Sequence, residues 1–129
     1  MVDFQQKEFT NQIITNLKNI TNLNVYGSYP EGTSSFPLAT VAITNLPTKF
    51  DIGYNELNLS ITCTLNLWGS KQTEVTDFLT AIEKNMIGYG FTRNTPTNIY
   101  KDNAVNKFTC SEIFRISYNR ITGKFERGL

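Results

Sequence analysis

The sequence contains no histidine and only two cysteines in 129 residues. The absence of histidine excludes Ser-His-Asp and Cys-His nucleophile systems, histidine-bound metals and imidazole proton relays. Cys63 and Cys110 do not form a CxxC pair, so the sequence indicates neither a zinc site nor a thioredoxin-type site. We interpret both as small buried hydrophobes in a reduced compartment, with a disulfide between neighbouring strands as the alternative.

Charged side chains are also scarce, at 18% of the residues, against about 25% in an average domain. Lys plus Arg number 12 and Asp plus Glu number 11, which gives a net charge of +1. No strong overall field therefore attracts nucleic acid or an anionic membrane. No apolar run approaches the ~18 residues of a membrane span. The first residues also lack the basic start and apolar run of a signal peptide.

The length fits one domain, residues 1–129, because domains usually hold about 100–200 residues. Two segments have the three- and four-residue apolar spacing of amphipathic helices. We expect the first to be capped by Asp3 and Gln6, with an apolar stripe at Phe9, Ile13, Ile14, Leu17 and Ile20. We expect the second to begin at Ser70 or Thr73 and to end at Gly88 and Gly90. Its stripe comprises Val75, Phe78, Leu79, Ile82 and Met86.

The clearest strand signal is the alternation of apolar and polar residues over 57–68, which predicts one core face and one polar face. Further strands are expected at 25–29, 38–44, 99–100 and 108–118, with Pro30 and Pro47 ending the first two of these. Helices separated by strand pairs, without regular βαβ alternation, predict an α+β fold. We expect a mainly antiparallel sheet with both amphipathic helices packed on one face, which leaves the other face available to a partner.

The polar face of 57–68 carries Asn, Ser and Thr, where a free surface more often shows Lys and Glu. This composition indicates contact with another protein, and the candidate subunit-interface residues are Ser60, Thr62 and Thr64. Glu112 interrupts the apolar face of the last long strand. That position leaves two interpretations open, an edge position or an ion pair at an interface, and Glu112 joins the candidates.

The C-terminal segment is basic, with Arg115, Arg120, Lys124 and Arg127 against Glu126. A short run of this kind usually solvates a terminus, and contact with nucleic-acid phosphates is the alternative. Glycine clusters such as Gly88-Tyr89-Gly90 lack the spacing of a phosphate loop, and no spacing rule pairs the carboxylates. We therefore expect no catalytic residues, no cofactor and no metal.

The whole-chain order of elements resembles the tail-terminator, or tail-completion, proteins of long-tailed bacteriophages and the related neck proteins of head–tail joining. The resemblance rests on a leading helix, the Pro-bounded segment 25–30 and a strand at 36–41. A long alternating strand at 57–68 follows, then a helix at 73–86 that ends near Gly90 and Phe91, and a final hairpin.

This resemblance implies a non-enzymatic structural protein of the virion, assembled in the host cytoplasm into a hexameric ring. The ring caps the tail tube, meets the head-side connector and lets DNA pass non-specifically, with no membrane involved. Arg115, Arg120, Lys124 and Arg127 then become candidates for the lumen or for a subunit contact. The segments 31–35 and 49–55 are expected to be mobile until a neighbouring subunit or the tail tube orders them. The alternative is a small ligand-binding or enzymatic α+β domain of cellular origin, which needs a polar group inside an apolar pocket.

Overall fold

The computed structural model describes residues 1–30 and 35–127. These residues form one seven-stranded sheet, in which the order β1-β2-β3-β6-β4 is supplemented by β5 and β7, both paired with β6. All pairings are antiparallel except that of β1 with β2. The strands are β1 (Asn24–Tyr26), β2 (Leu38–Phe50), β3 (Glu56–Gly69), β4 (Thr92–Arg93), β5 (Ile99–Asp102), β6 (Lys107–Asn119) and β7 (Lys124–Arg127).

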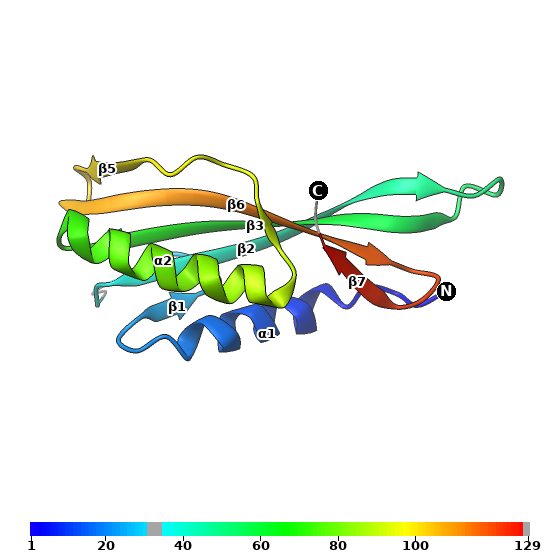
Figure 1. Cartoon of the computed structure of the whole chain (residues 1–129), viewed down its shortest axis with the longest axis horizontal. Coiled ribbons are helices and arrows are strands. Elements are labelled where there is room, and N and C mark those ends of the chain that lie inside the picture. Colours follow the sequence, from blue (N-terminus) through cyan, green and yellow to red (C-terminus); the bar gives the residue numbers. More distant parts are fainter. Residues whose placement is uncertain (31–34, 128–129) are drawn as a thin grey trace.

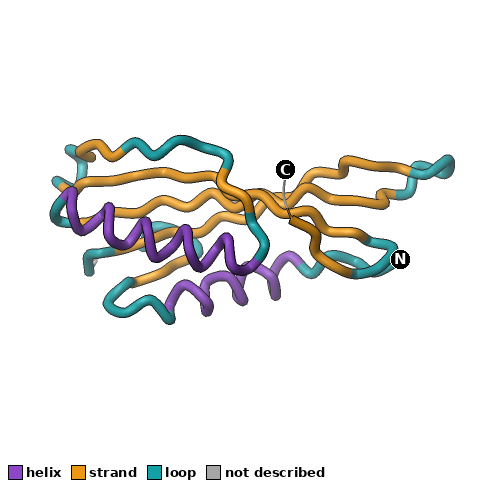
Figure 2. The backbone as a smooth tube through the Cα atoms, viewed as in Figure 1, coloured by secondary structure: helices purple, strands orange, loops and turns teal. Residues whose placement is uncertain are grey.

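Two helices, α1 (Gln6–Lys18) and α2 (Gln72–Tyr89), lie on the same side of the sheet (Figures 1 and 2). The predicted α+β class, with a mainly antiparallel sheet and both helices on one face, is confirmed. The core lies between this face and the helices, where the apolar side of β3 is buried from Leu59 to Leu67. The predicted stripes supply the buried residues of the helices, which are Phe9, Ile13, Leu17, Val75, Leu79, Ile82 and Met86.

The helix caps differ from the prediction. Gln5 occupies the N-cap of α1 and Lys71 that of α2, and neither donates or accepts a side-chain capping bond. The Asp3 carboxylate is instead bound by Arg120, so the predicted capping box is wrong. At the other end of α2, Gly90 has a φ of +123°, which strongly favours glycine, and its N–H donates back to the last helical turn.

Several strand ends were also predicted imperfectly. β2 continues through Pro47 to Phe50, although this proline was expected to end it. The outer neighbour β1 pairs with β2 only from Leu38 to Thr40. At Pro47 that edge therefore has no partner strand among the residues that the structure describes, and the missing N–H costs no ladder hydrogen bond. The predicted loop 31–35 lies outside the described residues, apart from Ser35.

Candidate functional site

The sheet face opposite the helices is uncharged over most of its area. We define the open face as the central outward side chains of the three long strands: Ala42, Thr44 and Leu46 of β2, Asn58, Ser60, Thr62, Thr64 and Asn66 of β3, and Ser111, Ile113, Arg115, Ser117 and Asn119 of β6. The strand ends are left out of this set: there the outward positions include the charged Glu56 and Lys107, and Trp68, on which Tyr29 packs. Strand register places these residues in rows, because paired residues point to the same side of a sheet. Arg115 is the one charged residue in this set.

The three predicted contact residues on β3 lie in the middle row of the open face. Ser60, Thr62 and Thr64 are half-buried because β2 and β6 flank them on both sides. Their position on a helix-free face agrees with the alternation of the sequence. Whether this face contacts another subunit stays a prediction.

A hairpin arm extends from the sheet beyond both helices (Figure 1). We define it as residues 46–58, which comprise the end of β2, the connecting turn and the start of β3. β2 has 13 residues and at about 3.3 Å per residue spans about 43 Å. α1 also has 13 residues but at about 1.5 Å per residue spans only about 20 Å. The strands therefore continue past the helical cover.

The hairpin arm carries large apolar side chains in solvent. Ile52 is fully exposed, Tyr54 is 86% exposed, Leu46 66% and Phe50 52%. The turn itself is built by Asp51, whose carboxylate accepts hydrogen bonds from the backbone and side-chain amides of Asn55. These bonds lower the pKa of Asp51. The sequence prediction treated 49–55 as a turn with nothing to anchor it and missed this apolar tip, although apolar residues at 50, 52 and 54 around Gly53 were a visible signal.

An aromatic cluster lies at the same end of the molecule, on the helix face. Phe9 stacks on Phe125 of β7 with ring centroids 4.9 Å apart, and Phe4 and Tyr118 pack against the same pair. A hollow of about 240 Å³ opens beside these rings, with Glu8 and Gln12 among its lining residues. The hollow is open to solvent, and the buried Tyr118 hydroxyl at its lining already donates to the Val2 and Asp3 carbonyl oxygens.

The structure does not bring the four predicted basic residues into one patch. Arg115 lies on the open face, directly opposite Thr62. Arg120 binds the Asp3 carboxylate at 2.6 Å and the Glu56 carbonyl at 3.1 Å, so it fastens the N-terminal segment to the base of the hairpin arm. Lys124 is exposed at the start of β7. Arg115 therefore shares a face with Ser60, Thr62 and Thr64, and the other three basic residues lie elsewhere.

Arg127 binds backbone carbonyl groups of its own chain. Its Nη1 donates to the carbonyl oxygens of Ile87 and Phe91, each at 3.4 Å, beside the C-terminal end of α2. A guanidinium at this position complements the negative end of the helix dipole. Arg120 and Arg127 are therefore engaged within the chain, whereas Arg115 and Lys124 remain candidates for an outside partner.

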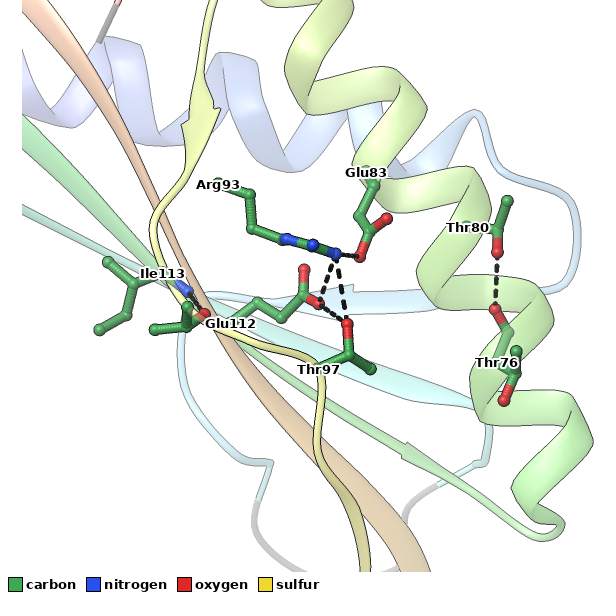
Figure 3. Close-up of polar contacts among 8 residues, drawn as sticks. Thr76, Thr80, Glu83, Arg93, Thr97, Glu112 and Ile113 are labelled. Atoms are coloured by element: carbon green, nitrogen blue, oxygen red, sulfur yellow. Dashed lines mark hydrogen bonds and ion pairs between the residues drawn. The ribbon is translucent and has the colours of Figure 1, made fainter. Parts of the chain in front are cut away.

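Glu112 does not lie where an interface residue must lie. Its side chain is fully buried on the helix face of β6, opposite Leu65. Its Oε1 accepts a hydrogen bond from the Thr97 hydroxyl at 3.0 Å and lies 3.8 Å from Nη1 of Arg93 (Figure 3). The expected ion pair exists, but it forms within one chain, and the placement of Glu112 in a subunit interface is corrected accordingly.

Both cysteines are free and buried, so the alternative of a disulfide is wrong. Burial raises the pKa of Cys63 to about 12 and also raises the pKa of Cys110. A thiol with a raised pKa is a poor nucleophile at neutral pH. Their role as small buried side chains in the core is confirmed.

No cluster of three or more Cys, Asp or Glu side chains suited to a metal ion occurs in residues 1–30 and 35–127. Within the same residues, neither helix is long and apolar enough to cross a membrane. The chain matches no protein-family model, and no curated protein matches its sequence. The candidate site is thus a surface, made of the open face and the hairpin arm, and its interpretation rests on geometry.

Proposed function

We propose that the chain is a structural subunit of a long-tailed bacteriophage that caps the tail tube as a ring and joins it to the head-side connector. The observation that carries this proposal is the pairing of an uncharged open face with an apolar hairpin arm on one chain. Both features remain uncovered in the isolated chain. An assembling subunit needs such surfaces, whereas an enzyme or ligand-binding domain needs a concave polar site.

Ring closure requires that two different patches of each subunit meet head to tail. The open face is suited to such contact because Ser, Thr and Asn side chains lose less on desolvation than Lys or Glu do. The tip residues Phe50, Ile52 and Tyr54 add apolar area that is exposed in one chain. We infer that the hairpin arm contacts a neighbouring subunit or the tail tube.

DNA that passes through the ring requires a different surface from that of a subunit contact. Weak, salt-screened attraction by a few cations tolerates sliding, whereas base contacts do not. Arg115 and Lys124 are the two predicted basic residues without a hydrogen bond from their charged ends in the described part of the chain. Lys124 is our candidate for the lumen, and Arg115, which lies opposite Thr62 on the open face, is our candidate for a subunit contact. Arg120 and Arg127 leave the list because they bind groups of their own chain.

The experiment compares Thr62→Arg with Thr76→Arg. Thr62 lies in the middle of the open face, and Thr76 is an exposed residue of α2 that points away from the sheet. Both variants gain the same side chain, so only position differs. We expect Thr62→Arg to fold normally, to fail to assemble and to yield tails of uncontrolled length, while Thr76→Arg behaves as the wild type.

The competing proposal, a small ligand-binding or enzymatic α+β domain of cellular origin, makes the opposite prediction. Such a domain can remain monomeric, and Thr62→Arg leaves its mass in solution unchanged. If both variants match the wild type in mass, tail length and infectivity, the ring proposal is wrong and the ligand-binding alternative takes its place.

A further inference from the structure

A carboxyl group without full hydrogen bonding lies beneath the outer edge of the sheet. Glu112 is fully buried, and its Oε1 accepts the Thr97 hydroxyl. Its Oε2 is also buried and has no hydrogen-bond partner among the described residues. A carboxylate oxygen in that position is costly, whereas a protonated carboxyl can donate a hydrogen bond from the same atom.

The charged groups around Glu112 favour protonation. Glu83 reaches it from α2 and Arg93 from β4 (Figure 3). Nη1 of Arg93 lies 2.8 Å from Glu83 Oε1 but 3.8 Å from Glu112 Oε1, so the guanidinium binds Glu83 first. Cys110, on the same strand, adds a buried thiol and no compensating positive charge. Two carboxylates therefore compete for one cation, and of the three side chains Glu112 is fully buried whereas Glu83 is 23% and Arg93 40% exposed.

The same glutamate helps to hold a segment of backbone in place. We define the strap as residues 94–98, which connect β4 to β5 along the edge of β6. Asn94 N–H donates to the Ile113 carbonyl at 2.7 Å, and Ile113 N–H donates to the Thr95 hydroxyl at 3.0 Å. The third contact is that of Thr97 with Glu112. Opening the strap breaks all three and admits water to Glu112.

We propose that the buried Glu112 carboxyl is protonated while the strap is closed, and that loss of this proton loosens the strap from the edge of the sheet. The inference concerns the chain itself and does not depend on the proposed function. Burial, and after it the nearby Glu83 carboxylate, raise the pKa of Glu112 to about 7, while the Thr97 hydroxyl and the Arg93 guanidinium oppose the increase.

The direction of the pH effect follows from proton binding. In the closed form Glu112 keeps its proton up to about pH 7. In the open form its carboxyl is hydrated, and its pKa returns toward the ordinary value of about 4.3. Between these two pKa values the closed form binds more protons than the open form. The free energy that favours the closed strap therefore decreases as the pH rises, and it becomes constant above the upper pKa.

Hydrogen exchange of the Ile113 amide measures strap opening directly, because this N–H donates to Thr95 of the strap. After correction for intrinsic exchange, we expect its protection in the wild-type chain to fall about tenfold per pH unit between about pH 5 and 7 and then to level off. The amides of Ile61 and Leu65 on β3 are the reference, since they report opening of the core. A protection factor for Ile113 that does not change with pH would overturn the proposal.

Two variants identify the group that holds the proton. Glu112→Gln keeps the shape of the neutral carboxyl and cannot ionise, so we expect the fall in protection to disappear. At pH 8 this variant should protect the strap at least as well as the wild type does. Glu83→Gln leaves Arg93 free to pair with Glu112, so we expect the fall to move to lower pH. If Glu112→Gln keeps the wild-type profile, or Glu83→Gln moves it to higher pH, the proposed role of the Glu112 proton is wrong.

Discussion

The two halves of the β2–β3 ladder have the same pairing and opposite environments. In the body, from Leu38 to Ile43 and across to β3, the helix-facing side chains are buried under α1 and α2. In the hairpin arm the antiparallel pairing continues, but Leu46, Phe50 and Tyr54 lie in solvent. Pairing alone therefore does not create a core. The helical cover does, and it ends before the strands do.

This difference separates the part of the ladder that stabilises the fold from the part that is exposed for contact with other molecules. Hydrophobic stabilisation grows with the apolar area removed from water, so the body supplies most of it and the hairpin arm little. Exposed apolar side chains on a protruding hairpin bring no benefit to an isolated chain, and patches of this kind mark interaction sites. The four predictions that follow test this division, from the largest expected effect to the smallest.

The largest effect is expected in the body. Ile61 is fully buried on β3, between the sheet and the helices. Ile61→Ala removes buried methyl groups and leaves a cavity, so the free energy of unfolding should fall by ~2–5 kcal/mol. Urea unfolding followed by circular dichroism measures this loss. An unchanged midpoint would mean that the body does not carry the stability assigned to it.

A smaller effect is expected where the body meets the hairpin arm. The Arg120 side chain links the Asp3 carboxylate to the Glu56 carbonyl, and it is only 19% exposed. Arg120→Ala removes charge-assisted hydrogen bonds, so the free energy of unfolding should fall by about 1 kcal/mol. Lys124→Ala is the matched control, because Lys124 is exposed, and we expect it to unfold as the wild type does. Equal midpoints for the two variants would contradict the structural role of Arg120.

A still smaller loss of stability is expected at the C-terminal end of α2. Arg127→Ala removes a guanidinium that donates to Ile87 and Phe91 carbonyls near the helix C-terminus. The exposed position limits the loss of stability to about 0.3–1 kcal/mol, and added salt should reduce it. Thermal unfolding at low and high salt checks both statements. A loss that is the same at both salt concentrations would argue against an electrostatic cap.

The smallest effect on stability is expected at the tip. Ile52 is fully exposed in the turn of the hairpin arm, so Ile52→Ala should change the free energy of unfolding by less than about 0.5 kcal/mol. It is the counterpart of Ile61→Ala, with the same chemical change made in the turn of the hairpin arm. A loss comparable to that of Ile61→Ala would show that the hairpin arm packs against its own chain in solution.

The sequence predicted what depends on periodicity. The alternation over 57–68 and the two apolar stripes determine which faces are buried, because burial of one face follows directly from the repeat of a strand or helix. The sequence predictions were wrong where contacts between residues far apart in the chain determine the position of a side chain. Asp3 binds Arg120 instead of capping α1. Glu112 contacts Arg93 of β4 and Thr97 of the strap, which lie far from it in the sequence.

The candidate site was predicted in part for the same reason. Ser60, Thr62 and Thr64 share a face by alternation alone, and the structure places them together. Alternation puts Arg115 on the outward side of β6, but its position opposite Thr62 depends on the register between β3 and β6, which the sequence does not state. The apolar tip was missed because exposure depends on where α1 and α2 end relative to the strands, a relation between elements far apart in the sequence.

The central claim is that the hairpin arm makes contacts between molecules and does not stabilise its own chain. The most direct test is the mass in solution, over a range of concentrations, of the wild type and of the triple variant Phe50→Ser, Ile52→Ser and Tyr54→Ser. We predict that the wild type assembles as concentration rises, while the variant remains a monomer with an unchanged melting temperature. A variant that assembles like the wild type, or that loses its folded structure, would contradict the claim.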